Sequence, residues 1–403
     1  MSENIKICPG FRFAGVHCGL KADDSALDLA LLLSDCPAAA AAVFTKNRFP
    51  AAPVIYGRKQ LAAGEKIKAV LINSGNANAC TGHQGEVDVA AVAEVLAAVL
   101  ELPRPQIFIS STGVIGEPLP VTTILNGVEL LAADLDENRT GNAALNRAAQ
   151  AIMTTDKSPK IAGVEVETSQ GVIALTGIAK GAGMIHPNMA TMLAYILTDA
   201  EVDADILAVM LKRVVDKSFN RISVDGDMST NDTVLALANG VSGCALTSAD
   251  DFESLEDSLL QIARDLAYMI VKDGEGATKV VKIKVVGAAD VVSAEKVCRA
   301  IANSSLVKTA FFGQDANWGR IIAAVGYAGV ELKPELVNIS FDQVRVVSNG
   351  LRDPQYQEEN GAAVLRKPEF SVKIDLQSGE DEFTILTSDL THEYVSINAD
   401  YRS

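Results

Sequence analysis

Apolar side chains recur along this 403-residue chain at spacings that predict helices in several places. Residues 87–100 have the pattern of an amphipathic helix, and helices are also predicted at 294–302 and 317–325. Two more helices are predicted from apolar residues that would share one helical face. The first face consists of Ile206, Val209, Met210 and Val214, and the second consists of Leu255, Leu259, Ile262, Leu266 and Ile270.

Shorter apolar runs between these helices predict strands. They lie at residues 107–110, 164–168, 172–178, 282–285, 306–311 and 345–350. The second and third runs, which a glycine separates, predict a hairpin, and the first predicts a strand that enters a turn at Thr112 and Gly113. Helices around a largely β centre predict an α/β fold in the form of a layered sandwich. Because 403 residues exceed a typical single core, two domains or two intimately packed layers are expected, with any domain boundary left open.

The segment around Thr191 has the most informative pattern. A strand-like run, 172–179, enters a glycine-containing loop that ends at a small residue, Ala190, and Thr191 then opens a second apolar run, 192–197. This is the layout of a chain that cuts itself before a threonine. The hydroxyl attacks the preceding carbonyl, and water opens the ester to release an α-amine. Such an amine titrates near neutral pH, so it can act as the base for its own hydroxyl.

The same segment allows two other interpretations. A glycine-rich turn between two core strands, with an incidental threonine, has this composition. Asn188 offers a competing route of cleavage, because asparagine can cyclise and break its own peptide bond, although that reaction is slow.

Eight sequence blocks, in order along the chain, carry a resemblance to a known family. They are 73–78 with 80–82, 110–116, 154–156 with 159–160, 180–193, 225–232, 273–279, 313–320 and 392–403. Together they resemble the ornithine acetyltransferase family, the ArgJ family of glutamate N-acetyltransferases in arginine biosynthesis. The block at 180–193 is similar to the processing site of that family, and the block at 110–116 is similar to its oxyanion segment.

The resemblance implies a self-processing enzyme of the N-terminal-threonine type with two domains. Cleavage between Ala190 and Thr191 would give an alpha fragment, 1–190, and a beta fragment, 191–403, that begins with the nucleophile Thr191. Thr112 and Gly113 match the oxyanion hole, with a side-chain hydroxyl and a backbone N–H as donors.

By position, the resemblance also implies a set of substrate contacts: Thr154, Lys180, Thr191, Glu275, Asn398 and Ser403. Lys180 suits a carboxylate or a developing negative charge, and Glu275 suits the side-chain ammonium of ornithine. The other side chains offer neutral hydrogen bonds. Ser403 stands where the family more often has threonine, so the hydroxyl is retained and the methyl group is lost.

The implied reaction transfers acetyl from N2-acetylornithine to L-glutamate through acetyl-Thr191, by a ping-pong course and without a cofactor. Acetyl-coenzyme A as an additional donor stays open, because members with and without that activity share these motifs. Two other classes fit parts of the pattern: a self-processing amidohydrolase or aminopeptidase, and a non-enzymatic phosphate- or nucleotide-binding protein that uses the loop at 181–183. The ordered blocks favour the transferase over both.

Charge and scattered polar residues exclude other classes. A net charge of −16 argues against nucleic acid as a partner. The four histidines have no spacing for a metal site or a catalytic triad, so no metal is predicted, and the role of His186 stays open. Asp225, Asp227 and Asp232 form no calcium loop and are expected to make hydrogen bonds at the active-site floor. Six cysteines without a CxxC pair predict buried free thiols.

The sequence predicts a soluble, cytoplasmic protein. The N-terminus lacks a basic region followed by an apolar stretch, and the most apolar run, 36–44, is far shorter than the roughly 20 residues that a membrane helix needs. The expected partners are N-acetylornithine and glutamate, with no membrane. The resemblance implies a dimer of two-fragment protomers.

Overall fold

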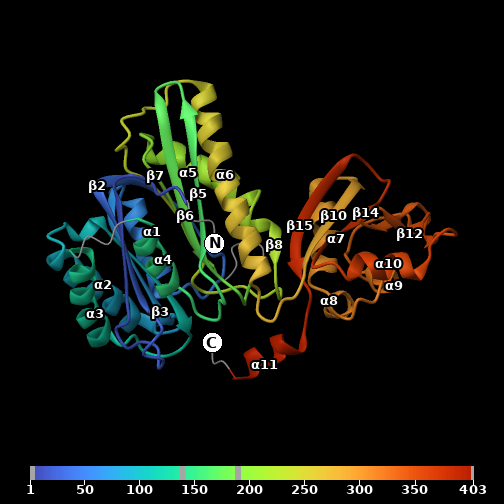
Figure 1. Cartoon of the computed structure of the whole chain (residues 1–403), viewed down its shortest axis with the longest axis horizontal. Coiled ribbons are helices and arrows are strands. Elements are labelled where there is room, and N and C mark those ends of the chain that lie inside the picture. The colour runs from blue at the N-terminus through green and yellow to red at the C-terminus, as the bar shows by residue number, and fades with distance from the viewer. Residues whose placement is uncertain (1–4, 137–140, 187–191, 401–403) are drawn as a thin grey trace. The chain divides into compact units, whose positions relative to one another are not determined.

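The computed structural model describes residues 5–136, 141–186 and 192–400, and it divides into two compact units. The first unit comprises the chain up to Asn220 and the segment Asp227–Ile270, and the second comprises Arg221–Gly226 and the chain from Val271 onward. Each unit contains a β-sheet with helices against it (Figure 1). The predicted α/β sandwich with two domains is therefore confirmed.

The first unit is built on a mixed sheet with the strand order β4-β3-β2-β9-β7-β6-β5, and β1 pairs with β2. Its strands are β1 (Phe11–Val16), β2 (Leu29–Phe44), β3 (Ile67–Asn76), β4 (Ile107–Val114), β5 (Lys160–Thr168), β6 (Gly171–Lys180), β7 (Leu193–Thr198) and β9 (Thr233–Ala238). β7 and β9 follow residue 191, yet they lie between β2 and β6, which precede it. The chain segments before and after residue 191 are therefore interleaved in one sheet.

Helices cover both faces of this sheet. They are α1 (Ala52–Ala62), α2 (Gly82–Val99), α3 (Val121–Asp136), α4 (Asn142–Ala151), α5 (Ala204–Asp216) and α6 (Ala249–Lys272), with short 3-10 helices at Arg104–Gln106 and Phe219–Arg221. Leu29 and Leu31 of β2 share a core with α2 and α3, whereas Ala30 and Leu32 share a core with α4. Successive side chains of a strand point to opposite faces, so these helices lie on opposite sides of the sheet.

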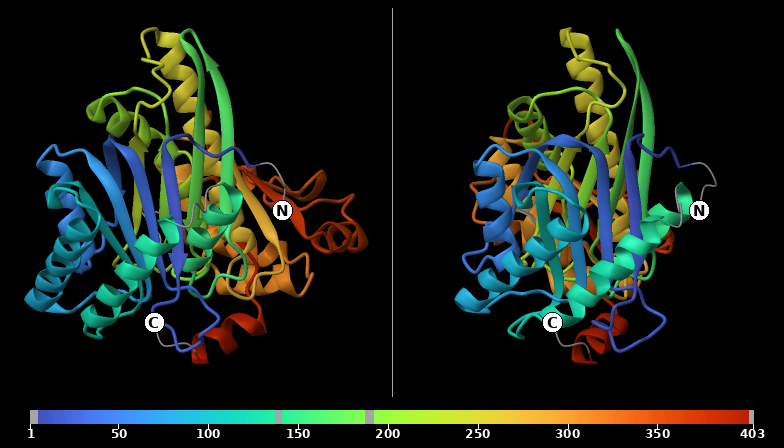
Figure 2. Two further views of the ribbon diagram at one scale, coloured as in Figure 1. Left: turned by 60° about the vertical axis from the view of Figure 1, so that its left-hand side comes forward. Right: turned by 90° about the vertical axis from the view of Figure 1, so that its left-hand side faces the viewer.

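The long helix α6 confirms the clearest periodic pattern of the sequence. It runs alongside the hairpin of β5 and β6 in every view (Figures 1 and 2). All of its predicted core residues are buried: Leu255, Leu259, Ile262, Leu266 and Ile270. Gly177 of β6 permits this close approach, because a Cβ there would stand 2.6 Å from Ile262 Cγ2.

The predicted face of α5 is wrong, although the helix itself is confirmed. Ile206 and Val209 are 38% and 56% exposed. The buried residues are Leu207, Met210, Leu211, Val214 and Val215. This set follows the complete i, i+3, i+4, i+7, i+8 pattern of a helix on a sheet, and α5 packs against β2. The prediction had included two apolar residues that lie on the solvent side of that stripe.

The second unit has its own sheet, with the strand order β13-β12-β11-β14-β10-β15-β8. The strands are β8 (Ile222–Ser223), β10 (Val280–Ala288), β11 (Asn338–Phe341), β12 (Val344–Ser348), β13 (Leu351–Arg352), β14 (Glu369–Asp375) and β15 (Asp381–Ser388). The helices are α7 (Val291–Ala302), α8 (Ser305–Phe312), α9 (Trp318–Gly326), α10 (Glu358–Leu365) and α11 (His392–Asp400), with a 3-10 helix at Pro334–Leu336. Side chains from β10, β11, β14 and β15 form one core with those of α7 to α10.

Residues 306–311 form helix α8 and not the predicted strand. The Ser304 hydroxyl caps the helix by accepting the Val307 N–H at 3.3 Å, and Ala310 and Phe311 are buried on the same side as Val307. A short apolar run does not distinguish a buried strand from a buried helix turn, so the capping serine decided the outcome. The other predicted elements are confirmed as α2, α7, α9, the β5–β6 hairpin, β10 and β12.

Two surface properties complete the description. All six cysteines are free, but Cys36 and Cys80 are exposed, so the prediction of buried thiols is wrong for these two. Within the described ranges, no helix is both long enough and apolar enough to cross a membrane.

Candidate active site

Thr112 and Gly113 lie inside β4 and not in a turn after it. The strand continues to Val114 beside β3, with Gly113 paired with Gly75. Gly113 has a φ of +133°, and a Cβ there would stand 2.3 Å from the carbonyl carbon of Gly75. The register of the two strands shifts directly after this pair. The predicted turn is therefore a bulged strand end, where backbone conformation and close approach both require glycine.

Lys180, the last residue of β6, connects two of the predicted site residues. Its Nζ lies 2.7 Å from Thr154 Oγ1 and 3.4 Å from Thr112 Oγ1. An ammonium group only donates, so both hydroxyl oxygens accept. Lys180 and Thr112 are 2% and 4% exposed. The fold thus brings together side chains from β6, from β4 and from the loop between α4 and β5.

Asp156 organises this cluster, although its role was not recognised in the sequence. Its Oδ1 accepts from Lys160 Nζ at 2.6 Å and from the Gly181 N–H at 2.7 Å. Its Oδ2 accepts the Thr154 N–H at 3.0 Å and lies 3.8 Å from Lys180 Nζ. Burial raises the pKa of the Asp156 carboxyl, but the charges of the two lysines and the hydrogen bonds outweigh burial and hold the pKa well below its usual range. The carboxylate is therefore ionised, and it holds Lys160 and the Gly181 N–H through one oxygen and the Thr154 N–H through the other.

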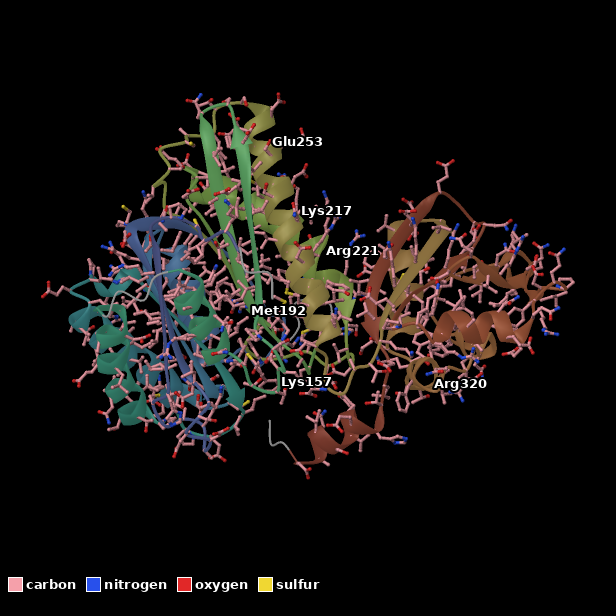
Figure 3. All side chains as sticks on the ribbon, viewed as in Figure 1. Lys157, Met192, Lys217, Arg221, Glu253 and Arg320 are labelled. Carbon is pink, nitrogen blue, oxygen red and sulfur yellow. The ribbon has the colours of Figure 1, made fainter. Side chains whose placement is uncertain are left out.

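A signal for Asp156 was present in the sequence. Asp156 and Lys160 are four residues apart within one of the eight blocks, a spacing that suits an acid–base pair. Lys157, labelled in Figure 3, belongs to the same short segment. The spacing alone did not show that Asp156 and Lys160 would be buried, nor that Asp156 would lie next to Lys180.

Lys21 adds a further positive charge. Its Nζ donates to the Met153 carbonyl at 2.8 Å, next to Thr154. Burial lowers the pKa of Lys21 to about 8; the charge of Lys180 acts in the same direction, and nearby carboxylates, Asp28 foremost, oppose it. Although the chain carries a net charge of −16, Lys21 and Lys180 bring two positive charges to the surroundings of Thr154, partly offset by Asp28 and Asp156. Such surroundings suit an anionic group of a substrate or of a reaction intermediate.

Met192, labelled in Figure 3, is the first described residue after the predicted cut, and it is 1% exposed. Its N–H donates to Asp232 Oδ1 at 3.1 Å, and its carbonyl accepts the Thr233 N–H at 3.1 Å. β7 follows directly, with Leu193 opposite Lys180 of β6 and opposite Thr233 of β9. The chain after the predicted cut is therefore anchored in the middle of the sheet.

Asn231 ties this anchor to the predicted oxyanion segment. Its Nδ2 donates to the carbonyl of Ala77 at 2.7 Å and to that of Ser111 at 2.8 Å. The Ser111 hydroxyl in turn donates to Asn73 Oδ1 at 2.6 Å. Three of the eight sequence blocks, at 73–78, 110–116 and 225–232, thus meet in one buried network.

The three acidic residues of the 225–232 block are divided between the two units. Asp232 belongs to the first unit, whereas Asp225 belongs to the second, where it accepts from the Tyr394 hydroxyl at 3.4 Å. Within the part of the chain that the structure describes, no group of three or more His, Cys, Asp or Glu side chains is placed to hold a metal ion. Hydrogen bonding is thus the observed role of Asp232.

Glu275 and Asn398 lie in the second unit and contact each other. Asn398 Nδ2 donates to Glu275 Oε2 at 2.7 Å and to the Tyr394 carbonyl at 3.0 Å. Glu275 is 6% exposed, and the next residue, Gly276, offers its carbonyl to the Thr391 hydroxyl at 2.8 Å. The loop before β10 and helix α11 are therefore joined where these two predicted substrate contacts lie.

Several predicted residues lie outside the described ranges. These are Ala190, Thr191 and Ser403, together with Asn188. Thr112, Gly113, Thr154 and Lys180 lie in the first unit, and Glu275 and Asn398 in the second. Their catalytic and substrate-binding roles stay predictions. His186 is half-buried, and its role stays open.

Comparison with known proteins gives a consistent result. The model of the ArgJ family matches residues 12–403. The arginine biosynthesis bifunctional protein ArgJ of Geobacter sulfurreducens is 48% identical over 403 residues, which cover 99% of this chain and 100% of that protein. The protein of the same name from Nitratidesulfovibrio vulgaris is 45% identical over 398 residues, which cover 98% of each chain. A solved structure of ornithine acetyltransferase from Mycobacterium tuberculosis, complexed with ornithine, is 41% identical, covering 45% of this chain and 92% of that chain, with a TM-score of 0.40.

Proposed function

Because the chain belongs to the ArgJ family, we propose that it cuts itself before Thr191 and then carries acetyl on that residue from N2-acetylornithine to L-glutamate. The protein is an acyltransferase of arginine biosynthesis that acts on small molecules. The observation that carries the proposed mechanism is the junction of Lys180 with the hydroxyls of Thr112 and Thr154, at the end of the strand that leads to the cut.

The proposed self-cleavage needs no outside reagent except water. The Thr191 hydroxyl oxygen attacks the Ala190 carbonyl carbon, the C–N bond breaks, and the hydroxyl proton passes to the leaving nitrogen. Water then hydrolyses the ester to an Ala190 carboxylate and a free Thr191. The products are an alpha fragment, 1–190, and a beta fragment, 191–403. The interleaving of β7 and β9 between β2 and β6 supports fragments that stay associated after the cut.

In the proposed transfer, the α-amine of Thr191 acts as the base for the Thr191 hydroxyl, which takes acetyl from N2-acetylornithine and passes it to glutamate. Thr112 and Gly113 donate hydrogen bonds to the negative charge that develops on the acetyl oxygen. The Thr112 oxygen already accepts from Lys180, so its hydroxyl hydrogen remains available as a donor to that oxyanion. The Lys180 charge acts in the same direction.

The remaining predicted contacts recognise the substrate in this proposal. Lys180 and Thr154 hold the α-carboxylate and the amide, and Asn398 and Ser403 add neutral hydrogen bonds. Glu275 favours the ammonium of ornithine. Ornithine and glutamate share an α-amino acid core, so one set of contacts serves both.

We propose further that the enzyme needs no cofactor and no metal, and that acetyl-coenzyme A is an optional second donor. The two fragments of one precursor form the protomer, and two such protomers form a dimer in the cytoplasm. Neither nucleic acid nor a membrane is a proposed partner. Assay of glutamate acetylation with acetyl-coenzyme A, with N2-acetylornithine as the reference donor, separates the two donor specificities.

The covalent course is tested with labelled acetyl. If Thr191 both receives and delivers acetyl, ornithine must leave before glutamate accepts it, so initial rates should follow ping-pong kinetics. N2-acetylornithine carrying a labelled acetyl group, supplied without glutamate, should leave label on the N-terminal peptide of the 191–403 fragment. Intersecting double-reciprocal plots without trapped label would indicate direct transfer in a ternary complex. Faster release of acetyl to water than to glutamate would indicate a hydrolase instead.

Replacing Glu275 by glutamine should weaken the use of N2-acetylornithine far more than the use of glutamate. The amide oxygen of glutamine still accepts from Asn398, so the local contact survives while the negative charge is lost. Steady-state kinetics with each substrate varied in turn measures the two effects. Glu393→Gln, an exposed change on the neighbouring helix α11, is the control. Equal losses for both substrates would show that Glu275 supports the site without reading the ornithine side chain.

A further inference from the structure

Lys308 is a buried lysine of helix α8 in the second unit, and it has no part in the proposed catalytic or substrate contacts (Figure 1). Its Nζ donates to the hydroxyls of Thr387 and Ser388 at 3.1 and 3.2 Å, and also to the Ser388 carbonyl. Its own backbone carbonyl accepts the Leu390 N–H at 3.2 Å. Lys308 therefore holds the chain on both sides of Asp389, where β15 ends.

These contacts do not require a particular charge on Lys308. Burial lowers the pKa of Lys308 to about 7, although the charges of Asp389 and Asp225 act in the opposite direction. A neutral amine has one donor fewer, but the hydroxyls of Thr387 and Ser388 can donate as well as accept. The amine can therefore bond to both hydroxyls and to the Ser388 carbonyl with or without the extra proton.

The segment that Lys308 holds is bonded to the loop before β10. Asp389, which is 3% exposed, accepts the N–H groups of Thr278 and Lys279 through Oδ1 at 2.9 and 3.0 Å. Its Oδ2 accepts the Thr278 hydroxyl. One carboxylate thus holds two successive backbone amides and a side chain of this loop.

The same loop also lies against the start of helix α11. The Thr391 hydroxyl donates to the Gly276 carbonyl at 2.8 Å. Gly276 has a φ of +66°, and a Cβ there would stand 2.5 Å from the Tyr394 nitrogen, so the two backbones meet without room for a side chain. Glu275 directly precedes this contact, and its Oε2 accepts from Asn398 of α11 at 2.7 Å. The position of Glu275 is therefore set by the segment after β15 and by the helix that follows it.

We propose that Lys308 is a positioning residue for the Glu275–Asn398 pair, and this inference rests on the proposed role of Glu275 in recognising the ammonium of ornithine. Lys308 acts without touching the substrate. It fixes residues 388–390, and this segment in turn fixes the loop that presents Glu275. Loss of the Lys308 amine should loosen that loop and weaken the use of N2-acetylornithine. Glutamate has no side-chain ammonium, so its use should change much less.

Lys308→Met keeps an unbranched side chain and removes the amino group. In hydrogen exchange of the mature two-fragment enzyme, the amides of Thr278 and Lys279 should lose protection, because both donate to Asp389, which is then held less firmly. In steady-state kinetics, kcat/KM for N2-acetylornithine should fall about 10-fold, mainly through KM, whereas kcat/KM for glutamate should change less than about 2-fold.

A double-mutant cycle shows whether Lys308 acts through Glu275. Glu275→Gln by itself should lower the use of N2-acetylornithine selectively. In that background, Lys308→Met should add less than about 2-fold to the loss, since the charge that Lys308 positions is already gone. Losses that simply multiply would show that Lys308 affects the substrate by another route, and would overturn the inference.

Val372→Ala controls for a general loss of stability. Val372 is 0% exposed in β14, in the core of the same unit, and its side chain takes no part in the contacts described above. This variant should lower Tm but leave the exchange of Thr278 and Lys279 and the ratio of the two kcat/KM values unchanged. Equal shifts of that ratio in Val372→Ala and Lys308→Met would reduce Lys308 to a structural residue and overturn the inference.

The remaining outcomes are also decisive. If Lys308→Met does not yield folded protein, Ser388→Ala carries the test, because it removes only the hydroxyl at 3.2 Å from Nζ and should shift the ratio in the same direction by less. A wild-type ratio in the folded variant that carries the test, together with a selective loss in Glu275→Gln, would overturn the inference while the proposed function stands. Equal losses for both substrates in Glu275→Gln would overturn the proposed role of Glu275 first, and this inference with it.

Discussion

Replacing Thr191 by alanine should leave one uncut chain of 42.4 kDa that transfers no acetyl. The wild-type protein should instead give two fragments, 1–190 and 191–403, each close to half of that mass. Alanine lacks the hydroxyl that attacks the Ala190 carbonyl and that later carries acetyl, so both activities depend on the same missing oxygen. A denaturing gel and intact mass measurement distinguish the two patterns, and sequencing of the second fragment should begin at Thr191.

The uncut variant should still be folded, and the wild-type fragments should stay together under native conditions. β7 and β9 lie between β2 and β6, so separating the fragments would expose strand edges and apolar side chains on both sides of the inserted pair. Thr198→Ala, which removes a buried hydroxyl from the last residue of β7, is the control and should cut normally. Two fragments persisting in Thr191→Ala would remove the self-cleavage mechanism.

Replacing Thr112 by alanine should lower kcat by ~10²–10³ with a much smaller change in KM. The Thr112 oxygen accepts from Lys180 at 3.4 Å, which leaves its hydroxyl hydrogen as a donor to the oxyanion of the transition state. This bond strengthens as negative charge develops, so its loss affects the chemical step more than binding. Self-cleavage should slow as well, because its tetrahedral intermediate develops charge on a carbonyl oxygen in the same way.

The conservative variant Thr112→Ser is the control for this prediction. It keeps the hydroxyl and removes only a methyl group, so it should recover most of kcat. Ser111→Ala, one residue earlier, deletes a hydroxyl that donates to Asn73 and should reduce stability more than it reduces kcat. A normal kcat in Thr112→Ala would place the oxyanion hole elsewhere.

The elements of the fold were predicted best where local pattern and tertiary burial coincide. The α6 stripe and the β5–β6 hairpin each contain enough periods to define one buried face. The predictions failed where the pattern was short or incomplete. Residues 306–311 were too few to distinguish a strand from a helix. In α5, the exposed residues Ile206 and Val209 shifted the predicted face. The end of β4 differs from the predicted turn because the bulge depends on Gly113 pairing with Gly75 of β3, and this pairing has no local signature in the sequence.

The candidate site shows the same division between sequence and structure. Thr112, Thr154 and Lys180 were selected by resemblance to a family, and the structure joins them through hydrogen bonds across sequence separations of 68 and 26 residues. Asp156 lies in a recognised block without an assigned role, and Asp232 was expected only to make hydrogen bonds. Their roles depend on partners that the tertiary structure supplies: the charges of Lys160 and Lys180 keep Asp156 ionised in spite of its burial, and Asp232 accepts the Met192 N–H.

The sequence by itself determined the family, the α/β class, the predicted cleavage position and the chemical types at the site, because motifs and periodicity are local properties of the chain. Only the tertiary structure decided that β9 and β7 lie between strands that precede residue 191. It also decided that the adjacent residues Asn231 and Asp232 form hydrogen bonds with Ser111 of β4 and with Met192, directly before β7. These contacts join residues 40 to 120 positions apart. Their geometry comes from strand order and burial, which arise when the whole sheet assembles and which no local spacing encodes.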